Sequence, residues 1–194
     1  IQNQKTQEVT PIQLFMLDGT GANRIPDFAV MYYTKAPIVS ELKYGTSIDN
    51  LNNTYKDPTA TRYHALIMKD LLPETRYFYS IDDGKTIYNF TTFSSTNRTL
   101  RFGFSSDPHF GKKSSNRTAT YGIFQQAIDP LNALDAFFIG GDFADYGFGD
   151  SHWIEGLEYI SPYTTQIPFK AIPGNHDSLF GGIELFKDYF YNRN

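Results

Sequence analysis

The sequence contains no cysteine, a single tryptophan and no apolar run long enough to cross a bilayer. Without thiols there is no thiolate catalysis, no cysteine-ligated metal and no disulfide, so redox chemistry does not indicate the compartment. A bilayer span needs about 20 apolar residues, and the lack of such a run argues against a membrane protein. The formal net charge of -4 provides no basic surface for phosphate backbones, which disfavours a dedicated nucleic-acid-binding protein.

The 194 residues suffice for one large domain or two small ones, and an aromatic share of 16% indicates a folded chain. Up to residue 98 the sequence shows short apolar segments, several of them alternating with polar residues, separated by turn residues. The candidate strands are residues 12–16, 28–33, 38–44, 63–68, 76–81 and 86–93. Because the strands are evenly spaced and no convincing helix lies among them, they predict an all-β sandwich over residues 1–98.

One segment of this half points to a particular kind of sandwich. Residues 71–77 read Leu-Leu-Pro-Glu-Thr-Arg-Tyr. This segment resembles the Leu-x-Pro-x-Thr-x-Tyr corner of fibronectin type III domains, in which the tyrosine hydroxyl bonds back to the backbone. The resemblance predicts a fold and carries no information about function.

From residue 99 onward the pattern changes to alternating strands and helices. Strands are predicted at residues 100–105, 136–139 and 169–172, and helices at residues 118–128 and 153–160. This β-α-β-α-β order is typical of a parallel sheet with right-handed crossovers. We therefore predict a mixed fold, in which the sandwich is followed over residues 99–194 by the first part of an α/β domain.

Polar residues with ligand chemistry follow the end of each strand in this second half. Asp107 and His109 offer a carboxylate and an imidazole, and Asp142 follows two glycines that allow a close approach to the backbone. Asn175 adds a neutral carbonyl oxygen next to His176. Because open α/β sheets bind ligands beyond the carboxyl ends of their strands, we expect these residues to share one pocket. Oxygen and imidazole donors without sulfur suit Mn, Fe or Zn.

A carboxylate in the central loop, such as that of Asp142, could bridge two ions about 3.5–4 Å apart, the arrangement used for attack on a phosphate ester. Water bound to such ions becomes a hydroxide nucleophile near neutral pH, while the cations neutralise the phosphate charge. His176 would donate a hydrogen bond or a proton to the leaving oxygen, with Asp177 a candidate for holding the histidine ring. The loops thus predict metal-dependent hydrolysis of phosphomonoesters or phosphodiesters.

The three loops together resemble a known family. Asp107-x-His109, Gly141-Asp142 and the run of residues 174–177 resemble, in order, the first three sequence blocks of the calcineurin-like metallophosphoesterases. The preceding sandwich looks like the N-terminal domain of purple acid phosphatases and their bacterial relatives. The resemblance implies that Asp107 and His109 hold one ion, that Asp142 bridges, that Asn175 binds the second ion and that His176 contacts the substrate phosphate.

The sequence departs from this family in two respects. Purple acid phosphatases place a metal-binding tyrosine three residues after the bridging aspartate, where this chain has Asp145, and their first block lacks the Asp-x-His arrangement. We therefore expect a general metallophosphoesterase site without a tyrosine-ligated ferric ion, with Asp145 beside a ligand and not on an ion. The family also supplies further histidine ligands downstream, and residues 178–194 contain no histidine.

The missing histidines predict a partner for the site. Either the rest of the catalytic domain follows in a longer chain, or a second polypeptide completes the coordination. We expect residues 1–194 alone to show little or no turnover. An intact mass of the native protein would distinguish a longer covalent product from a companion chain.

Other interpretations of these residues stay open. Asp107 precedes a proline, which by itself favours an extended strand end, and Asn175 is a suitable helix cap. A non-catalytic binding or adhesion module that uses the sandwich is the rival from another functional class, and a nuclease or nucleotidase is the rival enzyme. The sequence begins at Ile1 without methionine, which fits a secreted or periplasmic protein after removal of a leader, although a cloned fragment would begin in the same way.

For three further features, a structural role or simple exposure to solvent is the favoured interpretation. His64 lies within a predicted strand, and we expect a structural role for it. Trp153 lies early in a predicted helix, where core packing is favoured over a substrate platform. Lys112, Lys113 and Arg117 could steer an anionic substrate, but a solvated loop is the default interpretation.

Overall fold

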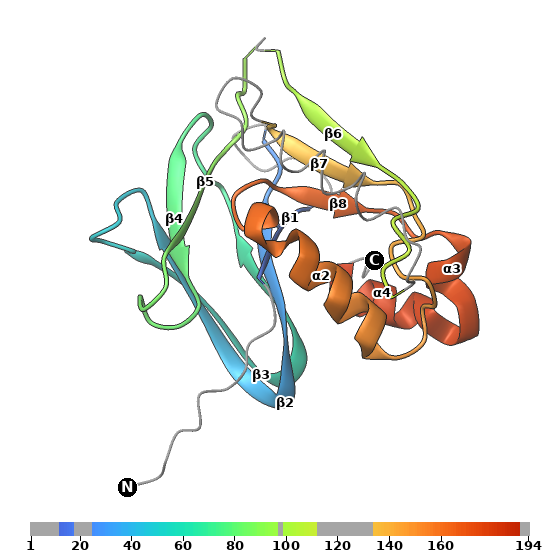
Figure 1. Ribbon diagram of the computed structural model, residues 1–194. Helices are drawn as coiled ribbons and strands as arrows, with labels where there is room; N and C mark the ends of the chain where they lie inside the picture. Colours follow the sequence, from blue (N-terminus) through green and yellow to red (C-terminus); the bar gives the residue numbers. More distant parts are fainter. Residues whose placement is uncertain (1–11, 18–24, 97–98, 112–133, 191–194) are drawn as a thin grey trace, which may run out of the picture.

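The computed structural model describes residues 12–17, 25–96, 99–111 and 134–190 (Figure 1). Its strands are β1 (Gln13–Met16), β2 (Phe28–Gly45), β3 (Asn53–Met68), β4 (Arg76–Ser80), β5 (Tyr88–Thr91), β6 (Phe102–Ser105), β7 (Ala136–Ile139) and β8 (Phe169–Ala171). Its helices are α2 (Asp150–Thr164), α3 (Asn175–Ser178), the 3-10 helix η1 (Leu179–Gly181) and α4 (Gly182–Phe190). The helix predicted over residues 118–128 lies outside the described residues, as do Lys112, Lys113 and Arg117.

The described strands form one hydrogen-bonded sheet in the order β5-β4-β2-β1-β8-β7-β6, with β3 paired to β2. Strands β6, β7 and β8 are parallel, as the β-α-β-α-β pattern predicted. Strand β1 is antiparallel to β2 and parallel to β8, and so connects the strands of the two predicted halves. The mixed α/β class is confirmed, whereas the separate N-terminal sandwich and the boundary between residues 98 and 99 stay predictions.

The long hairpin of β2 and β3 differs from the short strands expected there. The predicted strands 28–33 and 38–44 are parts of β2, which runs through the gap between them with register shifts near Ile38. Strand β3 begins at Asn53, ten residues before the predicted strand. Its first part is polar and contains Pro58, so neither apolar alternation nor β propensity indicated a strand. Pairing with β2 supplies the backbone hydrogen bonds instead.

One local feature of the predicted corner is present in the first half. The backbone N–H of Leu72 donates to the hydroxyl oxygen of Tyr77 over 3.1 Å, and the Tyr77 side chain is buried. This is the tyrosine-to-backbone bond expected from the sequence of residues 71–77.

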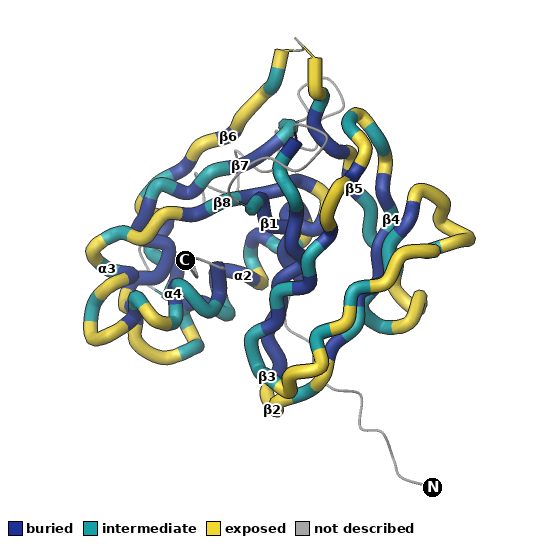
Figure 2. Tube along the Cα trace, turned by 180° about the vertical axis from the view of Figure 1, so that it is seen from behind, coloured by how far each residue is buried: buried dark blue, intermediate teal, exposed yellow. Residues whose placement is uncertain are grey.

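The helices gather against one side of the sheet, with β4 and β5 at the opposite end of the molecule (Figures 1 and 2). Strand β1 is buried on both faces, so that Phe15 enters one apolar cluster and its neighbour Leu14 enters the other. The cluster under the helices is mainly aromatic and includes Phe15, Phe110, Phe137, Phe143, Trp153, Phe169, Phe186 and Phe190. Trp153 is fully buried, which confirms its predicted place in the core.

The helices of the second half differ from the sequence prediction in two places. Helix α2 continues to Thr164 although Pro162 lies inside it. Because proline has no N–H for the carbonyl of Glu158, that carbonyl accepts instead from the Ser161 hydroxyl, over 3.3 Å. Helix α4 was not predicted, although its buried residues Phe186, Tyr189 and Phe190 follow helical spacing. Among the described residues, no helix combines the length and the apolar character that a membrane span requires.

Candidate metal centre

The loops that follow β6 and β7 run alongside each other beyond the ends of their strands. The backbone N–H groups of Asp107 and His109 donate to the carbonyls of Gly141 and Asp142, each over 3.0 Å. The N–H of Phe110 continues this ladder by donating to Phe143 over 2.8 Å. The first and second predicted ligand groups are therefore held in register by backbone hydrogen bonds.

Three of the predicted ligand residues have left-handed backbone conformations. The φ angles of Asp107, His109 and Asp142 are 56°, 48° and 49°. Such conformations are unfavourable for residues with a side chain and persist only where the surroundings impose them. The paired loops impose them here and thereby direct the three side chains toward one place.

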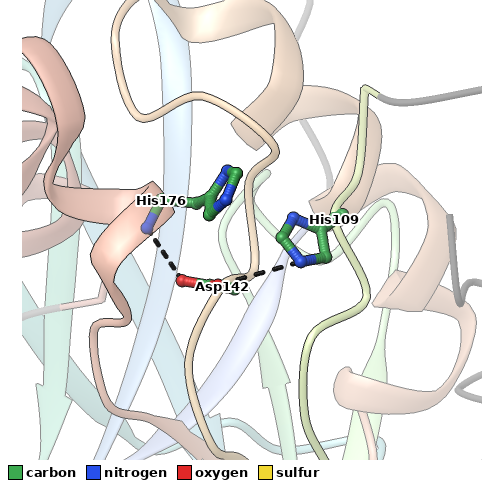
Figure 3. A group of neighbouring side chains, drawn as sticks. All are labelled: His109, Asp142 and His176. Carbon is green, nitrogen blue, oxygen red and sulfur yellow. Dashed lines mark hydrogen bonds and ion pairs between the residues drawn. The ribbon is translucent and has the colours of Figure 1, made fainter.

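His109, Asp142 and His176 form the centre of the site (Figure 3). One ligand atom from each lies within 4.8 Å of the others. The Nε2 atom of His109 is 3.7 Å from Oδ2 of Asp142, and the backbone N–H of His176 donates to Oδ1 of Asp142 over 2.8 Å. The two imidazole rings meet edge to face, with centroids 4.5 Å apart. Three separate loops thus bring two nitrogen donors and one carboxylate together.

The remaining predicted ligands lie around this centre. Oδ1 of Asp107 is 3.9 Å from Nε2 of His109, and the Asp107 side chain is exposed. Asn175 is the first residue of α3 and is also exposed. Among the acidic and histidine residues described, the structure groups His109, Asp142 and His176 most tightly, with Asp107 next to His109, and Asn175 directly precedes His176 in α3. The individual metal assignments stay predictions.

Asp145 lies behind the two histidines. Its Oδ1 atom is 3.3 Å from Nδ1 of His109 and 3.8 Å from Nδ1 of His176. The carbonyl oxygen of Asp145 is 2.6 Å from Nδ1 of His176. Because a carbonyl only accepts, this contact requires the proton on Nδ1 and leaves Nε2 as the nitrogen for other partners. The geometry agrees with the predicted place of Asp145 beside a ligand.

The surroundings of Asp177 differ from the role suggested for it. Its carboxylate accepts three backbone N–H bonds, from Phe143 over 3.1 Å, Ala144 over 2.8 Å and Gly174 over 2.9 Å. The suggestion that Asp177 holds the ring of His176 is therefore corrected, since the carbonyl of Asp145 makes that contact. Burial raises the pKa of Asp177, and the three backbone bonds oppose that rise. A direct catalytic part for Asp177 stays a prediction.

A close approach of two backbones explains one glycine of the third loop. A Cβ atom on Gly174 would lie 2.0 Å from Oδ1 of Asp142 and 2.3 Å from its backbone nitrogen. A Cβ atom on Gly141 would likewise lie 3.0 Å from Cα of Gly174, so the close approach expected at the Gly140-Gly141 pair is present, and Gly174 is the residue that touches the central carboxylate. Only the folded arrangement shows this, because Gly174 and Asp142 are distant in the sequence.

The donors present suit a metal ion. Two imidazoles and one carboxylate without sulfur are ligands that Mn, Fe and Zn accept. A carboxylate behind the histidines, such as that of Asp145, is the usual partner of metal-binding imidazoles. Sequence spacing could not assign the two contacts of Asp145, whose side chain lies near His109 and whose carbonyl oxygen orients the ring of His176.

Comparison with known proteins agrees with these features. Residues 100–194 match the family model described as calcineurin-like phosphoesterase. No curated protein matches the chain. Among solved structures, a purple acid phosphatase isolated from seeds of yellow lupin (Lupinus luteus) is similar, with a TM-score of 0.63 at 17% sequence identity. The match covers 88% of this chain and 36% of the lupin chain, so this chain spans about a third of that protein's length.

At 17% identity the structural likeness shows the fold alone. The family match falls on the half of the chain that carries His109, Asp142 and His176. The similarity to calcineurin-like phosphoesterases therefore rests on the match over residues 100–194, and the lupin structure agrees with it in fold.

Proposed function

We propose that this chain carries part of a two-metal site for the hydrolysis of phosphomonoesters or phosphodiesters. The observation that carries the proposal is the convergence of His109, Asp142 and His176 from three loops, with ligand atoms within 4.8 Å of one another. The family match to calcineurin-like phosphoesterases over the same residues supports it.

The residues divide into two sets of ligands around Asp142. Asp107 and His109 would hold one ion, Asn175 would hold the second, and the carboxylate of Asp142 would bridge them. Ions bound there would activate a water molecule and neutralise phosphate charge. Asp142 is 94% buried, so its charge is poorly solvated and a cation would stabilise it.

His176 is positioned to act on the phosphate or on the leaving group. Its Nδ1 proton is committed to the carbonyl of Asp145, which fixes the ring orientation. In the imidazolium form, Nε2 can donate to a phosphate oxygen or to the leaving oxygen. Its ring is only partly buried, so that a substrate can approach it.

The site would be completed by histidines that residues 178–194 do not contain. We propose that they come from the remaining part of the catalytic domain, in the same chain or in a second one. Residues 1–194 alone are then expected to show little or no turnover of nitrophenyl phosphate. Steady hydrolysis by this segment, abolished by Asp142→Asn, would contradict that expectation. The secreted or periplasmic location stays a prediction.

Calorimetric titration of the complete protein with Mn²⁺ or Zn²⁺ tests the proposal. We expect about two ions to bind tightly, and Asp142→Asn to weaken both because it removes the bridging charge. Asp49→Asn is the matched control, since it makes the same chemical change at an exposed loop position outside the site. Absence of tight metal binding would favour the non-catalytic binding module.

A further inference from the structure

Three exposed aromatic residues form a row beside the candidate metal centre. The fractional exposures of Tyr146, Phe148 and Phe180 are 42%, 55% and 75%. The ring centroids of Tyr146 and Phe148 are 6.1 Å apart, and those of Phe148 and Phe180 are 5.4 Å apart. Large apolar side chains that touch one another at the surface mark a binding surface more often than scattered ones do.

The row begins at the site itself. The ring centroid of Tyr146 lies 6.2 Å from that of His176, which is the residue positioned to contact a substrate phosphate. The aromatic surface is therefore continuous with the centre and extends outward through Phe148 to Phe180. A group attached to a phosphate held at the centre could lie over these rings.

The loop that carries Tyr146 and Phe148 is fixed by its neighbours. The N–H of Gly147 donates to the carbonyl of His176 over 3.0 Å, and the Gly147 carbonyl accepts from Nε1 of the buried Trp153 over 2.9 Å. The N–H of Tyr146 donates to Nδ1 of His152 over 3.2 Å. Tyr146 and Phe148 are thus held at set positions relative to His176, as a preorganised binding surface requires.

The outer residue of the row is in a strained conformation. Phe180 has φ 53° and ψ 35°, a left-handed conformation that is rare for a bulky residue. Core packing does not account for it, because Phe180 is three-quarters exposed. Backbone strain of this kind is concentrated at ligand-binding and active sites.

We propose that Tyr146, Phe148 and Phe180 form a stacking surface that selects phosphoesters with a planar aromatic leaving group. This inference rests on the proposed function and names a substrate class for the same site. Aromatic side chains bind planar rings through their faces and tolerate many ring structures. An aryl group and a nucleobase share that chemistry, whereas a short alkyl group cannot cover the row.

Ligand binding to the complete, metal-loaded protein tests this inference without measuring turnover. Calorimetry would give the Kd of inorganic phosphate and of the phosphonate analogues of methyl phosphate, phenyl phosphate and adenosine monophosphate, which the metal-loaded protein cannot hydrolyse. Each analogue is called below by the name of its ester. We expect phenyl phosphate to bind about tenfold more tightly than methyl phosphate, as one stacked ring provides. The double variant Phe148→Ala/Phe180→Ala should bring that ratio close to one and leave the Kd of inorganic phosphate unchanged.

The matched control is Phe102→Ala, which removes an exposed phenylalanine on β6 outside the row. It should leave the ratio unchanged. If adenosine monophosphate binds tightly and the double variant weakens this binding, the ring belongs to a nucleotide. If adenosine monophosphate does not bind tightly, the ring belongs to an aryl ester. Either result supports the stacking surface.

Three outcomes would overturn the inference. If inorganic phosphate does not bind, the proposed function fails as well. If phosphate binds but methyl and phenyl phosphate bind equally, the stacking surface alone is wrong. If the double variant converts an oligomer into a monomer in light scattering and leaves the ratio unchanged, the row is an interface between copies of the chain.

Discussion

Gly174 shows how a single missing side chain sets the geometry of the centre. Its φ of -97° is available to any residue, so the constraint is steric. A β-carbon at this position would overlap Oδ1 and the backbone nitrogen of Asp142. The third loop could not then approach the second, and the donors would separate.

We therefore predict that Gly174→Ala abolishes tight metal binding, measured by Mn²⁺ calorimetry. Gly84→Ala is the control, because a β-carbon at Gly84 meets nothing within 4 Å and the residue lies between β4 and β5, at the end of the molecule opposite the helices (Figure 1). Gly84 has φ 83°, so this control is expected to cost about 1 kcal/mol of stability without affecting the metal. Unchanged metal affinity in Gly174→Ala would contradict the packing of this loop.

His64 is a buried residue whose charge state affects stability. Its ring nitrogens contact the hydroxyls of Thr34 and Ser40, each over 3.0 Å, and its ring stacks on Tyr32 with centroids 4.4 Å apart. Burial lowers the pKa of His64, and the charge of Asp57 opposes this effect only in part. The structural role expected from the sequence fits these contacts.

Because the folded pKa of His64 is lowered, the unfolded state binds the proton more readily. The contribution to stability is therefore intact above the unfolded pKa of about 6.5 and is lost as the pH falls below it. We predict that the free energy of unfolding, from urea denaturation between pH 8 and pH 5, falls less steeply below about pH 6.5 in His64→Gln than in the wild type. Parallel curves for the two proteins would show that His64 does not contribute.

Much of the candidate site could be predicted at the level of residues because its chemistry is local in sequence. Asp107 and His109 are two residues apart, and Asp142 lies three residues after the end of β7. The contacts of Asp145 and Asp177 could not be predicted, since both depend on which backbone groups the folded loops present. A carboxylate next to a histidine in sequence need not face its ring.

The carboxylate of Asp177 helps to hold the short helix α3 in place. Asp177 lies in its third position and accepts the N–H of Gly174 just before the helix, which is the geometry of a helix cap. The same carboxylate accepts the N–H groups of Phe143 and Ala144 from the loop after β7. Asp177 thereby joins the second and third loops of the centre.

We predict that Asp177→Ala lowers the free energy of unfolding by about 3 kcal/mol or more, because it leaves several buried donors without an acceptor. Denaturation in the presence of a chelator would measure this loss without any contribution from metal. Ser178→Ala, which removes an exposed hydroxyl that donates to the Gly174 carbonyl, should cost less than about 1.5 kcal/mol. Similar losses in the two variants would contradict the proposed difference.

Elements were predicted best where the apolar pattern was strong. The strand at residues 136–139 matches β7, because four apolar residues in a row are bounded by Asp135 and Gly140. The first part of β3 and the last turn of α2 were missed, since tertiary pairing in one and a side-chain hydrogen bond in the other replace the local signal.

On the scale of the whole molecule, β1 is the link between the two halves of the sequence. Phe15 on this strand is 1% exposed and meets Phe169 edge to face, with centroids 5.2 Å apart. A second link is the buried hydroxyl of Tyr79, which donates to the carbonyl of Thr165 over 2.7 Å. No pattern in the sequence could predict these links, because parallel pairing between distant strands leaves no local trace.

We predict that Phe15→Ala lowers stability by about 3–5 kcal/mol in a single transition, because the large cavity lies where the two halves meet. Differential scanning calorimetry would show one peak that shifts as a whole. Two peaks, of which the variant moves only one, would instead support independent domains divided between residues 98 and 99.

The left-handed conformations of Asp107, His109 and Asp142 have a thermodynamic consequence. Isolated peptides from the three loops would rarely adopt these conformations, and the donors would lie far apart in an unfolded chain. Cations would then associate almost entirely with the native state, so that their binding energy adds to its stability by mass action. Because the ions would bind the native state and hardly at all the unfolded chain, the melting temperature would rise with the concentration of free metal.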